Sequence, residues 1–439
     1  MENQCTTLLH SAFIVTQDAQ RRIIEDGGIA VKQGRIAAIG SWQDLRHWQA
    51  QEVLELGNML VMPGLINAHT HATMTFLRGF ADDLPLMEWL TGHIFPVEAR
   101  LKPEVVRVAS LLGFAEMLRT GTTACVDMYL FESAVLQAAA QAGIRCQGGE
   151  VLFTFPSAAC PHWQQGLEQT RALAEEYKDN ERISVAVTPH SVYTTNDALL
   201  IAARDMAAEL NLPLHIHLAE TAEETAQSLS QHGLRPIAYA ESLGLLSPRT
   251  IAAHLVDSTE EEHSLLAQRG VTAVHNPSSN MKLASGIAPL PQMLAHAVPL
   301  ALGSDGPTSN NRMNMFTEMH HAALLHKGQS GNAAALPAQS VLDMATHGGA
   351  RALQQHPLLG MLAVDAPADL IALDLNEPNM QPLYSPVSHL VYAATGMEVR
   401  LSMVAGEVLY RDGLFSRFDY PALLQEVAAV RHWVLKKQA

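Results

Sequence analysis

Two histidines separated by one residue end an apolar run in the stretch 60-LVMPGLINAHTHATMTFLRGF-80. In a β-strand, residues i and i+2 project from the same face, so His69 and His71 could both reach one metal ion. An isolated H-x-H pair is more often an ordinary polar pair where a strand meets a loop. The pair alone leaves both interpretations open, and the rest of the chain must decide between them.

Seven further apolar runs also end in polar or ionisable residues, which are Asp127, Glu150, His190, His217 with Glu220, His254, His275 with Asn276, and Asp305. Three neutral imidazoles and one carboxylate suit a zinc-like ion and leave one position for water. The predicted ligands of a single zinc ion, with iron or manganese as alternatives, are His69, His71, His217 and Asp305. His215 competes with His217 because it lies on the same strand face, one layer deeper. A bound ion would lower the pKa of its water from about 15.7 towards 7.

Two more residues could move protons in a hydrolytic reaction at such a centre. Glu220 stands three residues beyond His217, where it could shuttle a proton to a ring nitrogen and a leaving group. His254 ends the next strand and could polarise or deprotonate the water together with Asp305. Taken singly, a glutamate there is more often a helix N-terminal charge, and a histidine in AAHLVD a core residue. Their matching positions on consecutive strands favour catalytic roles.

The elements that would position these residues alternate between strand and helix. Amphipathic segments of helical length separate most of the apolar runs, as in 103–121, with Pro103 near its start and Gly121 past its end. The eight runs are 60–69, 122–128, 144–153, 183–190, 213–220, 250–257, 271–277 and 298–306. They predict a (β/α)8 barrel of TIM type, whose active site would lie at the carboxyl ends of the strands. A doubly wound sheet is the alternative, but no G-x-G-x-x-G turn follows the first strand.

Both ends of the chain are rich in short strands. The strand-like segments are 7–16, 28–40, 52–64, 367–375 and 399–413, and Gln33-Gly34 is predicted as a hairpin turn. The α/β chain is therefore predicted to have two domains. Residues 1–60 and 365–439 would form a composite β-sandwich, and residues 61–364 the catalytic barrel.

Composition excludes several classes of partner. The 439 residues include 44 acidic and 28 basic side chains, for a formal charge of −16. A field of this sign repels phosphate backbones and anionic lipid, so neither nucleic acid nor membrane is expected as a partner. The four cysteines are scattered, and the N-terminal segment resembles no signal peptide. A cytoplasmic location is the expectation.

The motifs INAHTH, HIHLAE, AAHLVD, HNPSSNMKLASG and LGSDGPTSNN resemble the amidohydrolase superfamily in order and spacing. Within it, the chain is most similar to the deaminases of 5′-methylthioadenosine and S-adenosylhomocysteine, and segment 77–100 shares this likeness. The resemblance covers almost the whole chain. It implies the barrel, the composite β-sandwich and one zinc or similar ion.

Residue by residue, the resemblance implies metal ligands at the four positions named above and proton transfer by Glu220 and His254. It implies that Glu98 holds the ribose hydroxyls and that His190 contacts the substrate, as would Glu220 and Asp305. Two-metal relatives carry a modified lysine on the fourth strand, and ISVAVTPHSVY contains none. The one-metal form is therefore favoured.

One departure from the family pattern bears on the substrate. Relatives that use S-adenosylhomocysteine place arginines near the amino-acid tail, whereas 143-GIRCQGGEVLFTF-155 has Glu150 and apolar residues there. Arg145 is the only arginine between Arg119 and Arg171. Without a guanidinium to meet a carboxylate, the longer substrate loses its strongest contact. The expected reaction is deamination of 5′-methylthioadenosine to the inosine analogue and ammonia, with S-adenosylhomocysteine or adenosine as further substrates.

Other functions remain open on the same scaffold. Deamination of guanine, 8-oxoguanine or cytosine and dechlorination of a triazine would keep the metal set, although Glu98 favours a ribose-bearing substrate. A barrel that has lost its chemistry would lack metal ligands, and each expected ligand is present. A homo-oligomer is expected, since barrels of this kind often form dimers or tetramers. Segment 77–100 is expected to act as a lid over the sugar.

Overall fold

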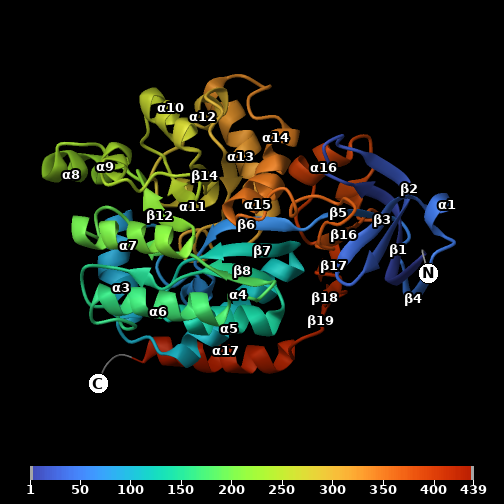
Figure 1. Ribbon diagram of the computed structural model, residues 1–439, viewed down its shortest axis with the longest axis horizontal. Helices are drawn as coiled ribbons and strands as arrows, with labels where there is room; N and C mark the ends of the chain where they lie inside the picture. The colour runs from blue at the N-terminus through green and yellow to red at the C-terminus, as the bar shows by residue number, and fades with distance from the viewer. Residues whose placement is uncertain (1–2, 437–439) are drawn as a thin grey trace.

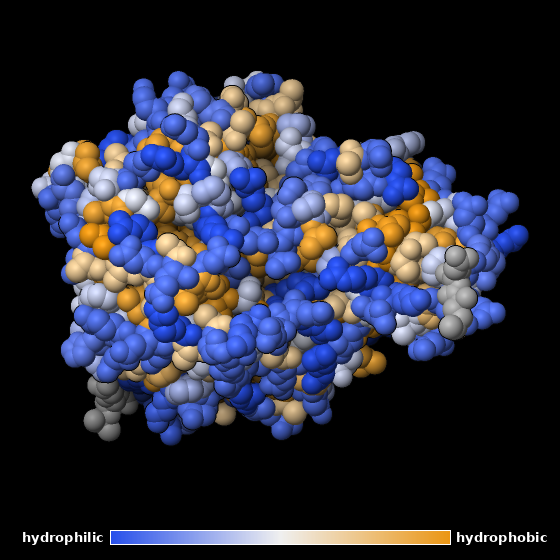
Figure 2. Space-filling view, viewed as in Figure 1, coloured by the Kyte–Doolittle hydropathy of each residue, from blue (hydrophilic) through white to orange (hydrophobic). Residues whose placement is uncertain are grey.

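A parallel barrel and a sheet built from both ends of the chain make up the computed structural model, which describes residues 3–436 (Figure 1). The sheet lies to one side of the barrel, and α17 (Tyr420–Leu435) returns from it along the barrel helices. Figure 2 shows hydrophilic residues over much of one face, with hydrophobic patches among them. Within residues 3–436, no helix combines the length and the apolar character needed to cross a bilayer.

The barrel has eight strand positions, and each coincides with one of the predicted apolar runs. Its strands are β6 (Leu65–Thr70), β7 (Thr122–Asp127), β8 (Arg145–Gly148), β9 (Val151–Leu152), β10 (Ile183–Val185), β11 (Thr188–Pro189), β12 (Leu214–Leu218), β13 (Thr250–His254), β14 (Thr272–His275) and β15 (Leu300–Leu302). β8 with β9 and β10 with β11 each form one position, and all neighbouring strands pair in parallel. Bridges between Thr70 and Asp305 and between Val187 and Leu214 close the ring. The predicted (β/α)8 fold is confirmed.

Helices follow the barrel strands and pack around them (Figure 1). Those of the barrel are η1 (Ala72–Leu77), α2 (Leu86–Trp89), η2 (Leu90–Ile94), α3 (Phe95–Glu98), α4 (Pro103–Arg119), α5 (Glu132–Ala142), α6 (Trp163–Glu176), α7 (Asp197–Leu210), α8 (Ala222–His232), α9 (Pro236–Ser242), α10 (Glu260–Arg269), α11 (Pro277–Lys282), α12 (Leu290–Ala295), α13 (Met315–Ser330), α14 (Ala338–Asp343), η3 (Met344–Gly348) and α15 (Gly349–Ala352). The remaining short helices are α1 (Trp42–Leu45), η4 (Pro378–Met380) and α16 (Pro386–Tyr392).

Local sequence explains where several of these helices begin and end. The predicted helix 103–121 is α4, which starts at Pro103 and is followed by Gly121 at φ 85°. At α10, the Thr259 side chain accepts from the Glu262 N–H while the Glu262 carboxylate accepts from the Thr259 N–H. This reciprocal cap satisfies two amide groups that the helix itself leaves without partners.

The sheet at the chain ends joins strands that are more than 300 positions apart in sequence. It contains β1 (Gln4–Val15), β2 (Ile23–Lys32), β3 (Arg35–Ser41), β4 (Gln49–Glu55), β5 (Met59–Pro63), β16 (Leu370–Asp374), β17 (Val399–Val404), β18 (Glu407–Arg411) and β19 (Leu414–Phe415). Gln33 and Gly34 both have positive φ, 52° and 77°, as a two-residue hairpin turn requires. Buried side chains from β1 to β17 share one cluster, so the sheet curves around a common core.

The predicted boundary at residue 60 falls inside β5, which pairs with both β1 and β16. Within the predicted sandwich segment 365–439, α17 contacts α4 of the barrel rather than the sheet alone. The two-domain division itself stays a prediction. Buried residues of α17 belong to the same hydrophobic cluster as the barrel helices, so barrel and C-terminal helix are packed together.

Candidate active site

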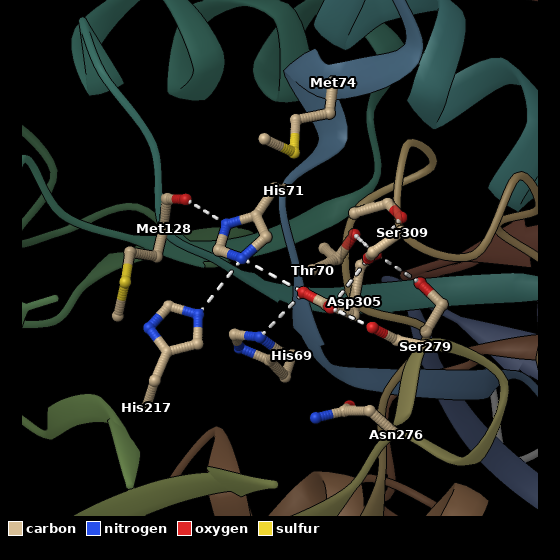
Figure 3. A network of polar contacts seen from close by, with 12 residues as sticks. His69, Thr70, His71, Met74, Met128, His217, Asn276, Ser279, Asp305 and Ser309 are labelled. Carbon is tan, nitrogen blue, oxygen red and sulfur yellow. Dashed lines mark hydrogen bonds and ion pairs between the residues drawn. The ribbon is translucent and has the colours of Figure 1, made fainter. Parts of the chain in front are cut away.

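Three side chains from three strand ends converge at the carboxyl end of the barrel (Figure 3). The Nε2 atom of His71 lies 3.1 Å from Asp305 Oδ1 and 3.2 Å from His217 Nε2. The outer ring nitrogens are held by backbone: His71 Nδ1 donates to the Met128 carbonyl oxygen at 2.6 Å, and His217 Nδ1 to that of His190 at 2.7 Å. Carbonyl oxygens only accept, so both Nδ1 atoms carry hydrogen and both Nε2 atoms point their lone pairs inward.

Two lone pairs and a carboxylate oxygen this close repel one another unless a cation lies among them. The donor set of imidazole nitrogens and one carboxylate oxygen is the set that suits a zinc-like ion. Burial lowers the pKa of His71, but the hydrogen bond and charge of Asp305 outweigh this and raise its pKa to about 9, so without a metal ion a proton on His71 Nε2 would take the place of that cation. The residues therefore fit a resident metal ion.

His69 completes the cluster from the same strand as His71. Its Nε2 lies 3.2 Å from Asp305 Oδ1, and its Nδ1 lies 2.8 Å from Nε2 of His215. Burial lowers the pKa of His69 to about 4, so the ring is neutral near pH 7 and able to bind a metal. The structure separates the two competing histidines of β12: His217 faces His71, and His215 contacts the far side of His69.

The second oxygen of Asp305 is held by two hydroxyl groups. Asp305 Oδ2 accepts from Ser279 Oγ at 2.5 Å and from Ser309 Oγ at 2.8 Å (Figure 3). Asp305 has φ 60°, and its N–H donates to the His69 carbonyl at 3.0 Å. Such a left-handed conformation is costly for a non-glycine residue and persists only when its surroundings hold it. Gly303 permits the backbone of residues 303–305 to lie this close to His69, because a Cβ at position 303 would lie 2.8 Å from the His69 carbonyl oxygen.

A fifth side chain, His254, reaches the same centre. Ligand atoms of four residues all lie within 4.8 Å of one another, and these residues are His69, His217, His254 and Asp305. Sequence reasoning gives His254 a role in proton transfer and places His71 among the ligands. The structure brings both rings to the centre, so the division of roles between His71 and His254 stays a prediction.

Glu220 and His254 lie side by side at the ends of neighbouring strands. Glu220 Oε1 is 3.9 Å from His254 Nδ1, and that nitrogen donates to Asn280 Oδ1 at 2.9 Å. Burial raises the pKa of Glu220, partly offset by the charge of His254. The backbone N–H of Glu220 donates to Glu224 Oε2 at 2.6 Å, and that of Ala219 to Glu224 Oε1 at 3.1 Å. A buried carboxylate thus fixes the turn that presents Glu220.

A cleft with about 610 Å³ of space, its open mouth included, leads to these residues. His71, His217, Glu220, His254 and Asp305 line its inner end. Segment 77–100 covers another side through Leu86, Trp89, Leu90, Phe95 and Glu98. The segment predicted as a lid therefore does form part of the wall of the cleft.

Glu98 and His190 also line the cleft, as the sequence predicts. Glu98 is buried, and its Oε1 accepts from the Tyr129 hydroxyl at 2.6 Å. Burial raises the pKa of Glu98, while the Tyr129 hydrogen bond lowers it. The His190 ring lies 4.7 Å from the ring of Phe153, centroid to centroid, and its Nδ1 is 3.0 Å from Thr194 Oγ1.

A second recess of about 530 Å³ adjoins the cleft beyond Glu98. Both spaces share Phe95, Glu98, Leu130 and Phe153, and the recess adds Phe155 together with Ala158. The rings of Phe153 and Phe155 stack with centroids 4.7 Å apart. Among the described residues, no lysine or arginine lines either space.

Sequence reasoning missed the residues that hold the predicted ones in place. Tyr129 and Glu224 carry no motif signal, since each is a single polar residue after a strand. Ser279, Asn280 and Ser309 lie inside the quoted motifs HNPSSNMKLASG and LGSDGPTSNN, and only their positions beside His275 and Asp305 could have drawn attention to them. Glu150, in contrast, faces away from the cleft: its carboxylate accepts from the N–H groups of Phe131 and Glu132.

Comparison with known proteins places the chain in a family. A model of the Amidohydrolase family matches residues 60–409. A 5-methylthioadenosine/S-adenosylhomocysteine deaminase of Desulfovibrio desulfuricans is 58% identical over 434 residues, covering 99% of this chain and 98% of that protein. One from Lawsonia intracellularis is 56% identical, covering 100% and 99%. The crystal structure of an adenosine deaminase from Xanthomonas campestris with bound zinc superposes with TM-score 0.96 at 39% identity, covering 98% and 99%. The chain therefore belongs to the amidohydrolase family.

Proposed function

We propose that the protein is a metal-dependent aminohydrolase that converts 5′-methylthioadenosine to its inosine analogue and ammonia. The observation that carries this proposal is the chemical difference between the two ends of the cleft. One end holds the histidine and carboxylate cluster with Glu220, and the other holds Glu98 beside an apolar recess. A purine would lie at the first end, a ribose at Glu98, and a 5′-substituent in the recess. The names of the relatives at 56–58% identity support the same substrate class.

We assign the metal to His69, His71, His217 and Asp305, as one ion per chain. Zinc is proposed because the Xanthomonas campestris structure carries it, with iron or manganese as alternatives for the same donors. Such an ion, when bound, would supply Lewis-acid activation of a water molecule. The outer contacts of His71 and His217 with carbonyl oxygens fix the ring orientations that binding needs.

The chain's own groups would move the protons of the reaction. Glu220 gives a proton to N1 of the purine while the oxygen of water adds to C6, and His254 with Asp305 accepts the proton that this water loses. The new C6 hydroxyl then gives its proton to Glu220, which passes it to the C6 amine, so that the C–N bond breaks and ammonia leaves. The proton held by His254 and Asp305 restores Glu220 for the next cycle. One water is consumed, and the 6-oxo product is formed. His190, at the wall of the cleft, would contact the purine.

Ribose recognition is assigned to Glu98. Its Oε1 is occupied by the Tyr129 hydroxyl, so Oε2 would accept the ribose hydroxyls. A carboxylate that accepts from two adjacent hydroxyls favours a nucleoside over a free base such as guanine. It also disfavours a triazine, which carries no such diol.

The recess beyond Glu98 suits a small apolar 5′-substituent. Phe95, Phe153 and Phe155 supply its aromatic surface. The guanidinium of Arg145 is engaged elsewhere: Nε and Nη2 donate to Asp369 at 2.6 Å and 3.0 Å, on the sheet side of the barrel. The carboxylate of S-adenosylhomocysteine would therefore meet no cation among the residues lining the recess, and we propose that this nucleoside is the poorer substrate.

A deamination panel on protein of measured metal content tests the proposal. It would compare 5′-methylthioadenosine, S-adenosylhomocysteine, adenosine and guanine by ammonia release. The highest kcat/KM is expected for 5′-methylthioadenosine. Turnover of guanine alone, or of none of the four by protein loaded with zinc, would contradict the proposed activity. A higher kcat/KM for S-adenosylhomocysteine would contradict only the assignment of the recess.

Compartment and assembly stay predictions. All four cysteines are buried and unpaired, which fits the predicted reducing cytoplasm. A homo-oligomer remains the expectation for the assembly. Light scattering during size-exclusion chromatography would measure the mass directly, and a mass of 47.6 kDa would contradict it.

A further inference from the structure

A buried glutamate on α13, Glu318, joins two segments that border the active site, α11 and the loop after β15. Its Oε1 accepts from Ser278 Oγ at 2.7 Å and from Asn310 Nδ2 at 2.8 Å, and its Oε2 accepts from the Ser278 N–H at 3.2 Å. Ser278 belongs to α11, directly after β14, and Asn310 lies in the loop after β15. Glu318 has no exposed surface and does not line the cleft.

The sequence neighbours of these anchor points hold the reacting groups. Ser279 and Ser309 both donate to Asp305 Oδ2, at 2.5 Å and 2.8 Å. Asn280 accepts from His254 Nδ1 at 2.9 Å. Each of the three residues lies one or two positions from a residue that Glu318 binds. Loss of the Glu318 contacts would therefore release α11 and the loop after β15 at once.

We infer that Glu318 is a positioning residue, which fixes the orientations of Asp305 and His254 through residues 278–280 of α11 and residues 309–310 of the loop after β15. The inference rests on the proposed function, because Asp305 and His254 act in the reaction proposed above. Gln is nearly the same size as Glu, but its amide can satisfy only part of this set. If its oxygen meets Ser278 Oγ and Asn310 Nδ2, its NH2 faces the Ser278 N–H as donor against donor.

A second glutamate in the same molecule provides a matched control. Glu398 is also buried, and its carboxylate accepts from the N–H of Thr395 at 3.0 Å, from Thr395 Oγ1 at 2.8 Å and from Asn379 Nδ2 at 2.6 Å. These are the same three kinds of donor. The Thr395 carbonyl also accepts from Asn314, the residue that caps α13, so Glu398→Gln would loosen the start of this helix without touching α11 or the loop after β15.

The first test compares Glu318→Gln with Glu398→Gln in steady-state deamination of 5′-methylthioadenosine. For Glu318→Gln, kcat should fall about 10- to 100-fold, the usual effect of removing an outer-shell partner. KM should change little, because Glu98 and the recess are unaltered. Glu398→Gln should keep the wild-type kcat, although its loss of thermal stability should be similar to that of Glu318→Gln. Equal kcat values for both variants, reduced or not, would overturn the inference.

The second test does not use turnover. Wild type and both variants are loaded with Co²⁺, whose visible absorption reports the geometry of its ligands. Glu318→Gln should shift the band, as should Ser279→Ala, and Glu398→Gln should leave it at the wild-type position. An unshifted band in Glu318→Gln would overturn the inference. Because this readout needs no substrate, a wild type that deaminates nothing would contradict the proposed function and leave the positioning role measurable.

A milder variant covers the case in which Glu318→Gln does not fold. Asn310→Ala removes one of the three donors and the contact with the Ser304 carbonyl, while Ser278 stays bound to Glu318. The loss of kcat in Asn310→Ala should be smaller than the loss expected for Glu318→Gln. The Co²⁺ band should shift in the same direction as in Ser279→Ala. Wild-type kcat together with a wild-type band would overturn the inference.

Discussion

Asp305 is contacted at both oxygens of its carboxylate by residues from other parts of the barrel rim. One carboxylate oxygen lies beside His69 and His71, and the other is held by Ser279 and Ser309. The burial of Asp305 would raise its pKa, but the hydrogen bonds from the two histidines hold it well below its usual range. The side chain is therefore an anion in a fixed orientation, which is the state that the proposed metal ligation requires.

Replacement of Glu220 tests the proton-transfer role at the residue scale. Glu220→Gln removes the transferable proton and keeps the shape, so kcat should fall about 100- to 10,000-fold. Metal content, measured by plasma emission, should stay at the wild-type level. Glu223→Gln, an exposed neighbour on α8, is the control and should keep full activity. Near-normal turnover by Glu220→Gln would refute the role.

Glu98 is predicted to recognise the diol of the ribose. A hydrogen bond to a charged group contributes about 1.5–3 kcal/mol, so Glu98→Gln should raise KM about 10- to 100-fold. The comparison substrate is 2′,3′-dideoxyadenosine, which lacks both hydroxyls. With this analogue, wild type should no longer have the lower KM, and the KM values of wild type and Glu98→Gln should become similar. An undiminished difference between them would show that Glu98 acts in another way.

At the element scale, segment 77–100, the predicted lid, is joined to the barrel rim by polar contacts of Lys282 and Arg78. Lys282 Nζ donates to Asp82 Oδ1 at 2.5 Å, to Asn311 Oδ1 at 2.5 Å and to the Thr308 carbonyl at 2.8 Å. Arg78 adds a contact with the Asn311 carbonyl at 2.9 Å. These contacts link the lid, α11 and the loop after β15, and they lie outside the cleft itself. The lid is thus placed by polar contacts at its edge and by apolar residues within.

Removal of this link should loosen the lid. Lys282→Ala should raise KM for 5′-methylthioadenosine several-fold, on the order of the 1 kcal/mol that a partly exposed ion pair contributes, with a smaller change in kcat. Lys327→Ala is a matched control, because Lys327, which lies on α13, also donates to backbone carbonyl groups. Its partners are the carbonyl oxygens of Ala335 and Leu336. An unchanged KM in Lys282→Ala would show that the apolar contacts alone hold the lid.

At the scale of the whole molecule, buried carboxyl groups beneath the rim couple stability to pH. Burial raises the pKa of Glu150 to about 7, that of Glu224 to about 8 and that of Glu318 to about 7. All three accept backbone N–H groups in the segments that follow barrel strands. The folded state binds protons more tightly than the unfolded chain. These groups therefore stabilise the fold below about pH 4.5, and this contribution is lost as pH rises to about 8.

Glu224→Gln isolates one of these groups. Gln does not titrate, so the difference in unfolding free energy between wild type and variant should shrink as pH rises from 5 to 8, by about 1 kcal/mol or more. Urea unfolding of both proteins at several pH values measures it, and any metal contribution common to the two cancels. A difference that stays constant, or that grows with pH, would show that Glu224 is ionised throughout the range.

The sequence predicts much of the fold because the strand runs are apolar over their whole length and helices intervene between them. Each of the eight runs is a barrel position, and the hairpin at Gln33-Gly34 is present as expected. Boundaries were harder to predict where packing decides them. The run 52–64 is two strands, β4 and β5, and β5 pairs with β16 from the far end of the chain. No local pattern shows that partner.

The same distinction applies to the active site. Residue types at strand ends, such as His69, His71 and Asp305, are visible in the sequence because ligand chemistry restricts them to few kinds of side chain. Supporting residues such as Glu318 and Tyr129 are not visible, because any donor or acceptor that reaches the right atom would serve. The contact of Tyr129 with Glu98 joins positions 31 residues apart, and that of Glu318 with Ser278 joins positions 40 residues apart.

The sequence by itself determined the fold class, the family motifs and the set of candidate ligands, since periodicity and residue chemistry are local properties. Only the tertiary structure decided that His215 contacts the back of His69 while His217 faces His71, and that Arg145 binds Asp369 rather than a substrate. It also decided which residues hold the loops of the active site. Those facts depend on the direction and distance of side chains across the closed barrel, which residue order does not specify.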